Sequence, residues 1–429
     1  MLQTAPEYIA QKIPSVFFRF SQEFGDAGFQ AVLVGGAIRD IVLGDEPGDF
    51  DFATDAEPEQ VMQLFPSVIP TGIQHGTVTV RFHKHSIEVT TYRVDGEYSD
   101  RRRPDSVSFT RSLADDLQRR DFTINALAIA LPDCQVIDET GGLQDLDSRT
   151  IRAIGTPQQR FREDALRIWR ALRFSARLGF NIEPATAAAM QEEAAGVRAI
   201  AAERIRDEWI KLLSGSYAGE AVLYAAQIRI LDTVVPDILT DTDVLRPVCQ
   251  GFETAPNPAA ENPGALWEWR FATLLAIAVQ KDQKRVNELH RFLNERRYSR
   301  RDVSVLLHTL RAILADVPET ADIVPARRYL HCLQKADYLL VQHYRRLLGL
   351  PTASRKMCEL LHTESDRGIA YSPADLAVNG TELARILDRP PGPWVGRCLS
   401  SLLQRIVDCP EDNTPGTLLA YAREWAGSF

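Results

Sequence analysis

The chain has 429 residues, more than one hydrophobic core accommodates, so roughly two to four domains are expected. Its apolar fraction of 45% and charged fraction of 25% are ordinary for a globular protein. No apolar run approaches membrane-spanning length. The net charge of −9 argues against a protein that coats nucleic acid without selectivity, although a locally basic site remains compatible with it.

The N-terminal segment and the cysteines indicate the cellular compartment in which the protein is expected. Residues Met1–Phe20 have neither the basic start nor the small-residue cleavage site of an export signal. The six cysteines form no Cys-X-X-Cys pair and have no histidine spacing suited to zinc. We therefore expect reduced thiols in a cytoplasmic protein.

In chain order, the first 150 residues alternate between helical and strand patterns. The expected elements are a helix at Tyr8–Gly25, a strand at Phe29–Gly35, a helix at Gly36–Leu43, a strand at Asp49–Ala53, a helix at Pro58–Phe65 and strands at Thr77–Phe82 and Ser86–Tyr92.

From about Thr150 to the C-terminus the pattern is helical. The segment Gln250–Gly264, rich in Pro, Asn, Gly and Ala, predicts a linker or a long loop. Further helices are expected around Glu203–Leu213, Trp267–Val279, Arg301–Leu314, Arg327–Leu350 and Val395–Val407.

The most informative pattern begins with a glycine pair. Gly35 and Gly36 follow a buried strand and lead into a helix that carries Arg39. Glycines let the backbone approach phosphates closely, and an arginine one helical turn further on can reach the same phosphates.

Two aspartates complete this pattern. Asp49 and Asp51 lie two residues apart, so on a strand their side chains point to the same face. Neighbouring carboxylates repel unless a cation lies between them. Hard divalent ions, normally Mg²⁺, are the usual partners, and a nucleoside triphosphate supplies the remaining oxygens. An ordinary acidic turn explains Asp-X-Asp alone, but together with the glycines it predicts nucleotidyl transfer.

Glu88 is a candidate third carboxylate. On its strand it could bind the metal or accept the proton of an attacking hydroxyl, but a surface pair with an arginine is an equally good interpretation. The following segment, Arg93–Asp116, carries many charges of both signs. We expect either a lid or lever beside the acidic strands or a plain surface loop.

A second arginine-rich motif spans Leu117–Ala126. It predicts an apolar helix with Arg119, Arg120 and Asp121 at its start. A helix start beside an arginine suits triphosphate oxygens, whereas capping by Asp121 is the purely structural alternative.

The segment Glu163–Arg173 predicts a helix with Asp164, Arg167 and Arg170 close to one face and Arg173 turned further round. Surface ion pairs are the simpler interpretation. The alternative is base readout, because cytosine and adenine both present an exocyclic amine beside a ring nitrogen acceptor. Asp164 would accept from the amine and Arg167 would donate to the ring nitrogen. Guanine and uracil would leave both groups unpaired, at about 1–3 kcal/mol per mismatch.

Taken together, these motifs resemble the class II tRNA nucleotidyltransferase (CCA-adding enzyme) and bacterial poly(A) polymerase superfamily. The matching pieces occur in family order: Gly35-Gly-Ala-Ile-Arg-Asp40, Asp49-Phe-Asp51, Arg119-Arg-Asp-Phe-Thr-Ile-Asn-Ala126, Asp138–Leu146, Ile151–Gly155 and Glu163–Arg173. The resemblance is strong over about residues 28–215.

The resemblance implies an α+β fold, with a small mixed-sheet nucleotidyltransferase head at 1–150, a helical neck at 151–250 and a helical body and tail at 265–429. It implies that Asp49 and Asp51 bind Mg²⁺ as catalytic residues. Glu88, from its place on the neighbouring strand, is the candidate third catalytic carboxylate. The residues implied to hold or read the nucleotide are Gly35, Gly36, Arg39, Arg120, Asp164, Arg167, Arg170 and Arg173.

Two further segments favour the CCA-adding branch. Gly72–Val80 is similar to that branch and lacks the arginine-rich segment of poly(A) polymerases, and Leu376–Gly380 with Pro391–Gly396 resembles the tail of long CCA-adding enzymes. The residues at 95–105 resemble the flexible loop that CC-only members tend to lack. An enzyme that adds only A would keep this loop.

We therefore expect an enzyme that adds C, C and A to the 3′ end of tRNA from CTP and ATP, with release of pyrophosphate. Three alternatives remain: an A-adding tRNA nucleotidyltransferase, a poly(A) polymerase, and a non-catalytic RNA-binding protein on a degenerate nucleotidyltransferase fold. Nothing in the sequence indicates the oligomeric state.

Overall fold

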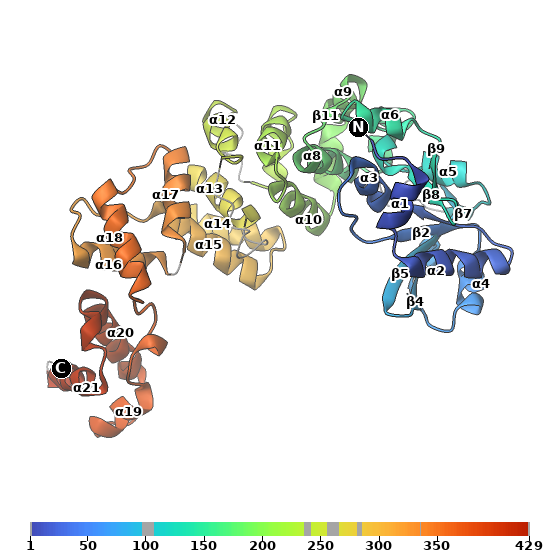
Figure 1. The fold of residues 1–429 in the computed structure, drawn as a ribbon. Helices are drawn as coiled ribbons and strands as arrows, with labels where there is room; N and C mark the ends of the chain where they lie inside the picture. The colour runs from blue at the N-terminus through green and yellow to red at the C-terminus, as the bar shows by residue number, and fades with distance from the viewer. Residues whose placement is uncertain are drawn as a thin grey trace. The chain divides into compact units, whose positions relative to one another are not determined.

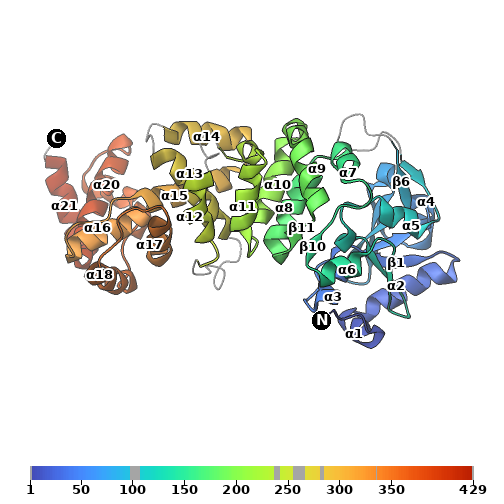
Figure 2. The same cartoon turned by 90° about the horizontal axis from the view of Figure 1, so that it is seen from above.

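The computed structural model describes residues 2–96, 107–235, 242–254, 266–280, 285–334 and 336–427. The chain divides into two compact units, Met1–Thr242 and Asp243–Phe429. In the described residues the sheet lies in the first unit, and the second unit is helical (Figures 1 and 2). This confirms the α+β class and the sheet followed by helices.

The first unit is built on a seven-stranded sheet in the order β3-β4-β5-β2-β1-β8-β9. Its strands are β1 (Ala31–Val34), β2 (Asp51–Thr54), β3 (Val68–Gly72), β4 (Thr77–Phe82), β5 (His85–Thr91), β8 (Leu127–Ala130) and β9 (Gln135–Asp138). Strands β2 and β5 run parallel and the other neighbours antiparallel, so the sheet is mixed, as predicted.

Six helices and a short ribbon accompany this sheet. They are α1 (Pro6–Lys12), α2 (Ser15–Asp26), α3 (Gly36–Leu43), α4 (Pro58–Leu64), α5 (Leu113–Gln118), α6 (Gly142–Asp147) and the ribbon of β6 (Arg93–Asp95) with β7 (Val107–Phe109). The single helix expected at Tyr8–Gly25 is wrong. Pro14 divides it, because the residue before a proline is disfavoured in the helical conformation and Ile13 is extended.

A phenylalanine cluster packs α2 against one face of the sheet. The Phe20 ring lies 5.0 Å from Phe52, 4.9 Å from Phe65 and 5.2 Å from Phe82. Successive side chains on a strand point to opposite faces. The burial of Phe52 against α2 therefore turns Asp51 to the other face.

Helices follow from α7 onward in the first unit. They are α7 (Pro157–Glu163), α8 (Leu166–Leu178), α9 (Pro184–Glu193), α10 (Ala202–Leu213) and α11 (Ala218–Gln227). Helices α8 and α10 pack through Trp169 and Trp209, whose ring centroids are 5.7 Å apart. The expected helical pattern is interrupted only by the two-residue strands β10 (Thr150–Ile151) and β11 (Asn181–Ile182) among the described residues.

The second unit contains ten α-helices in its described parts. They are α12 (Thr242–Gln250), α13 (Leu266–Gln280), α14 (Val286–Glu295), α15 (Arg300–Leu314), α16 (Ile323–Leu333), α17 (Tyr338–Leu347), α18 (Arg355–Asp366), α19 (Gly380–Ile386), α20 (Pro393–Asp408) and α21 (Pro415–Gly427). The helix expected at Arg327–Leu350 is thus two helices. Most of the predicted linker, residues 255–264, lies outside the described residues. In the described parts, no helix is both long and apolar enough to cross a bilayer.

Gly142 at the start of α6 gives a stability prediction. A Cβ atom there would lie 2.4 Å from the carbonyl oxygen of Thr123, a backbone atom that cannot move aside cheaply. Gly142→Ala should therefore destabilise the first unit by about 1–3 kcal/mol. Gly25→Ala is the matched control, because a Cβ at this exposed position in α2 meets nothing within 4 Å and should stabilise by roughly 0.5 kcal/mol. Urea unfolding of both variants checks this expectation. Equal urea midpoints for Gly142→Ala and wild type would contradict it.

Candidate active site

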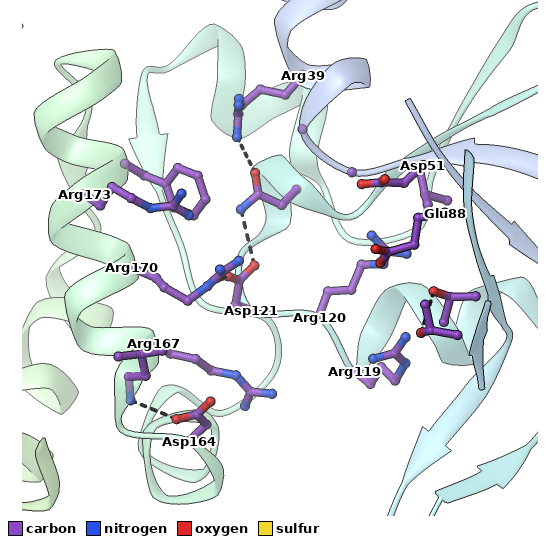
Figure 3. A pocket seen from close by; sticks show the side chains of 18 of the residues that line it. Arg39, Asp51, Glu88, Arg119, Arg120, Asp121, Asp164, Arg167, Arg170 and Arg173 are labelled. Carbon is purple, nitrogen blue, oxygen red and sulfur yellow. Dashed lines mark hydrogen bonds and ion pairs between the residues drawn. The ribbon is translucent and has the colours of Figure 1, made fainter. Parts of the chain in front are cut away.

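A cavity of about 580 Å³ lies in the first unit between the sheet and α8 (Figure 3). Its lining residues include nine arginines and four carboxylates, although the whole chain is acidic. The arginines are Arg39, Arg93, Arg119, Arg120, Arg167, Arg170, Arg173, Arg177 and Arg204, and the carboxylates are Asp51, Glu88, Asp121 and Asp164. Such an excess of positive charge in a concave site favours a polyanionic ligand.

Asp51 and Glu88 form the acidic side of the cavity. Asp51 begins β2, and the parallel register that pairs Phe52 with Val89 places Glu88 beside it on β5. Burial, followed by the charge of Glu88, raises the pKa of Asp51 to about 6, while Arg120 acts in the opposite direction. Because the two carboxylates oppose each other's ionisation, a cation bound between them would be favoured.

Asp49 does not lie on the strand, so the expected Asp49–Ala53 strand is wrong at its start. The pairing of β1 with β2 ends at Val34 and Asp51, because the chain turns away at Gly35. Asp49 is exposed and lines a second cavity of about 470 Å³, which it shares with Asp51 and Glu88. Its charge still helps to raise the pKa of Asp51, although burial and the charge of Glu88 are the larger causes.

A metal ion would need oxygens beyond those of the protein. Among the described residues, no three His, Cys, Asp or Glu side chains are grouped closely enough to hold a metal by themselves. The adjacent oxygens of Asp51 and Glu88 nevertheless fit a hard divalent cation, and the arginine-lined cavity beside them fits a ligand that brings further oxygens.

The glycine pair opens the cavity between Asp51 and Arg120. Gly35 has φ 85°, a conformation that favours glycine, and it precedes the first residue of α3. A Cβ at Gly35 would lie 3.7 Å from Nη1 of Arg120 and 3.9 Å from Oδ2 of Asp51. The absence of a side chain therefore keeps the space between these two charged groups open.

Arg39 is on the cavity wall but is already hydrogen-bonded. Its guanidinium donates to Oδ1 of Asp40 at 2.9 and 2.8 Å and to Oδ1 of Asn125 at 2.6 Å. Asn125 in turn donates to Asp121 at 3.3 Å, and Arg170 donates to Asp121 at 2.7 Å (Figure 3). A continuous chain of hydrogen bonds thus joins α3 to α8.

The helix expected at Leu117–Ala126 is wrong. Helix α5 ends at Gln118, a short 3₁₀ turn covers Thr123–Asn125, and β8 follows. The apolar run is a buried strand that pairs with β1 on one side and β9 on the other, and short apolar runs do not distinguish a strand from a helix. Arg119, Arg120 and Asp121 still line the cavity. Asp121 is buried, and although burial opposes ionisation, Arg170 holds its pKa down to about 2.

Asp164 lies between two helices, not within one as expected. Helix α7 ends at Glu163, and α8 begins at Leu166, whose backbone N–H donates to Oδ1 of Asp164 at 3.0 Å. Aspartate competes for backbone donors in this way and thereby interrupts helices. Oδ2 of Asp164 also pairs with Nη2 of Arg204 at 2.7 Å. Asp164 still lines the cavity with Arg167, so the two groups remain neighbours there.

Arg167, Arg170 and Arg173 project from α8 toward the cavity (Figure 3). Arg167 pairs with Glu163 at 2.5 Å, and Arg173 pairs with Glu208 at 2.8 Å. Each arginine therefore has a carboxylate that fixes its position.

Sequence reasoning missed three residues that support the site: Asp116, Arg204 and Glu208. The positions of Arg119 and Arg120, three and four residues after Asp116, are a detectable signal for a helical ion pair. Arg204 and Glu208 lie more than thirty residues from their partners, so no local spacing indicates them. Residues 97–106 of the expected lid lie outside the described residues, so that expectation stays a prediction.

Three family models match successive parts of the chain. The "Poly A polymerase head domain" matches residues 31–152, the "Probable RNA and SrmB- binding site of polymerase A" matches 179–241, and a tRNA nucleotidyltransferase domain 2 model matches 268–422.

Known proteins resemble the chain over nearly its whole length. The CCA-adding enzyme of Leuconostoc citreum is 36% identical over an alignment that covers 99% of this chain and 98% of that enzyme. The CCA-adding enzyme of Geobacillus thermodenitrificans is also 36% identical, over 92% of this chain and 93% of that enzyme. The crystal structure of Bacillus stearothermophilus CCA-adding enzyme in complex with CTP has a TM-score of 0.71 at 30% identity, covering 97% of this chain and 99% of that one.

Nucleotidyltransferases of this kind generally use a divalent metal ion. With two adjacent carboxylates, an arginine-lined cavity and full-length relatives at 36% identity, the chain belongs to the CCA-adding enzyme family of tRNA nucleotidyltransferases.

Proposed function

We propose that the protein adds C, C and A to the 3′ end of tRNA without a template, taking CTP and ATP and releasing pyrophosphate. One observation carries this proposal: a single cavity joins the carboxylates Asp51 and Glu88 to the side chains Asp164 and Arg167. The first pair suits phosphoryl chemistry, and the second suits recognition of a base.

The acidic pair would hold the metal, for which we propose Mg²⁺. Asp51 and Glu88 would be its ligands, and Asp49, which lines the second cavity together with both of them, would add a further carboxylate. Bound there, Mg²⁺ would neutralise triphosphate charge and lower the pKa of the attacking 3′-hydroxyl. Because Glu88 is exposed beside Asp51, it is also placed to accept that proton.

The arginines and glycines would hold the triphosphate. The opening at Gly35 and Gly36 lets phosphates lie between Arg120 and Asp51, next to the first turn of α3. Arg39 lines the cavity beside this opening on α3, and Arg170 and Arg173 add positive charge from α8. In this arrangement the phosphates are positioned by fixed donors.

Asp164 and Arg167 would select the base. Asp164 keeps lone pairs free beyond its bonds to Arg204 and Leu166, so it can accept from the exocyclic amine of cytosine or adenine. Arg167, held by Glu163, would donate to the adjacent ring nitrogen. Guanine and uracil present the reverse pattern and would leave both groups unpaired.

The remainder of the chain would bind the RNA. We propose that the helical residues 151–250 and 265–429 hold tRNA through its phosphates and by shape. A cytoplasmic location agrees with this substrate, and none of the six cysteines forms a disulfide.

The proposed activity is tested with tRNA transcripts that end at the discriminator base, at C or at CC. We expect labelled CTP to extend the first two transcripts, and labelled ATP to extend the third by one residue. An A-adding enzyme would extend only the CC transcript, and a poly(A) polymerase would add many A residues to unrelated RNA. No extension of any transcript would contradict catalysis altogether.

Asp51→Asn tests the metal site through pH. Because the folded pKa of Asp51 is raised to about 6, its contribution to metal-free stability is present below its ordinary pKa near 4 and lost as pH rises through 6. Mg²⁺ should offset that loss by binding the carboxylate form. We expect Mg²⁺ to raise the melting temperature at pH 7.5 more than at pH 5 in wild type, and at neither pH in Asp51→Asn.

In the same variant, nucleotide incorporation should fall at least 1,000-fold, while the dissociation constant for CTP changes by less than about tenfold. Exposed Asp45→Asn is the matched control and should behave as wild type. Substantial turnover by Asp51→Asn would contradict the assignment of Asp51 as a metal ligand.

Asp164→Ala and Arg167→Ala test base readout. Each removes one partner of an edge contact worth about 1–3 kcal/mol, so discrimination of CTP over UTP should fall roughly 5- to 150-fold. Arg162→Ala is the control, because Arg162 lies on α7, outside the cavity, and pairs with Glu193. The measurement is the ratio of kcat/KM for the two nucleotides. Unchanged ratios in both variants would refute the readout.

A further inference from the structure

We propose that Asp116, a buried carboxylate behind the cavity wall, positions Arg119 and Arg120 to bind the nucleotide phosphates beyond the first. Asp116 does not line the cavity, whereas both arginines do. The inference rests on the proposed function, since it assumes that this cavity takes a nucleoside triphosphate. Asp116 is then a positioning residue and touches neither substrate nor metal.

The two oxygens of Asp116 are divided between the two arginines. Asp116 is 0% exposed on α5. Its Oδ1 accepts from Nε of Arg119 at 2.8 Å and pairs with Nη2 at 2.7 Å, and its Oδ2 accepts from Nη2 of Arg120 at 3.1 Å. One buried carboxylate therefore determines where both guanidinium groups lie.

The pairing is strong enough to overcome burial. Burial acts to raise the pKa of Asp116, but the charges and hydrogen bonds of Arg119 and Arg120 hold that pKa below its ordinary value. The carboxylate is therefore ionised at neutral pH. Removal of its charge would leave two adjacent guanidinium groups repelling each other.

Arg120 retains hydrogen-bonding capacity for a ligand. Its Nη1 faces the open turn at Gly35, near Asp51, where a phosphate would lie. Asp116 thus occupies one end of the guanidinium and leaves other donors directed at the cavity.

Asp116 also holds an adjacent part of the wall. The backbone N–H of Arg93, at the start of β6, donates to Oδ1 of Asp116 at 3.4 Å. Arg93 lines the cavity and donates to the carbonyl oxygen of His75. The same carboxylate therefore aligns the beginning of this strand with the arginine pair.

Charge and position predict opposite effects for Asp116→Asn. A negative charge directly behind the arginines opposes the binding of an anion, so a purely electrostatic role predicts tighter CTP binding in the variant. A positioning role predicts weaker binding, because the two guanidinium groups lose their common acceptor and their fixed geometry.

The experiment compares CTP with CMP, which lacks the phosphates beyond the first. Calorimetry without RNA gives both dissociation constants, so the result does not depend on whether any transcript is extended. We expect Asp116→Asn to reduce the affinity advantage of CTP over CMP at least tenfold and to leave CMP binding within threefold of wild type. An unchanged or increased advantage would overturn the proposal.

A control variant separates this effect from loss of stability. Glu364 in the second unit is 2% exposed and likewise holds two arginines, Arg327 at 2.6 Å and Arg367 at 2.8 Å. Glu364→Gln should therefore lower the melting temperature comparably and leave the CTP advantage unchanged. Loss of the CTP advantage in Glu364→Gln as well would assign the effect to general destabilisation and contradict the proposal.

A double-mutant cycle with Arg120→Gln tests whether Asp116 acts through that arginine. If it does, the double variant should bind CTP no more weakly than Arg120→Gln alone. In extension assays, Asp116→Asn should raise KM for CTP and ATP alike and leave the CTP-to-UTP preference unchanged, because base selection occurs at the other end of the cavity. Additive losses, or altered base preference with unchanged KM, would contradict a positioning role.

Discussion

The site depends on carboxylates, most of them buried, that lie behind its arginines. A buried guanidinium is costly unless it is paired, and several of them around one cavity also repel each other. The protein places an acid behind seven of the nine arginines that line the cavity: Asp40 for Arg39 and Arg177, Asp116 for Arg119 and Arg120, Asp121 for Arg170, Glu163 for Arg167 and Glu208 for Arg173. Arginine positions are thus determined before any ligand arrives, so little reorganisation is needed on binding.

Asp121 connects the sheet to the helices that carry the arginines. It accepts hydrogen bonds from the backbone N–H of Phe122, from Asn125 and from Arg170 on α8. Because its pKa is lowered to about 2, its stabilising contribution is present above its ordinary pKa and is lost only as pH falls through about 2. The link between α8 and the segment that leads into β8 therefore persists at neutral pH, and it holds the two walls of the cavity together.

The local part of the site could be predicted from the sequence, and the rest could not. The glycine turn with Arg39, and Glu88 on an alternating strand, follow from spacing within a few residues. The helix predicted at Leu117–Ala126 fails because a short apolar segment fits a buried strand equally well. Asp164 interrupts its predicted helix by accepting from the backbone N–H of Leu166 at the start of the next one, and it also pairs with the distant Arg204. Tertiary pairs of this kind leave no periodic pattern in one sequence.

The proposed base readout also explains why its two groups are charged. A carboxylate only accepts hydrogen bonds and a guanidinium only donates them, whereas an asparagine or glutamine amide can turn over and present either pattern. Asp164 is fixed by Arg204 and by the N–H of Leu166, and Arg167 is fixed by Glu163 and the carbonyl oxygen of Arg160. Neither group can reverse its polarity to suit guanine or uracil. On the proposed readout, a pair that cannot adapt would accept both cytosine and adenine, because these bases share the one edge pattern that it complements.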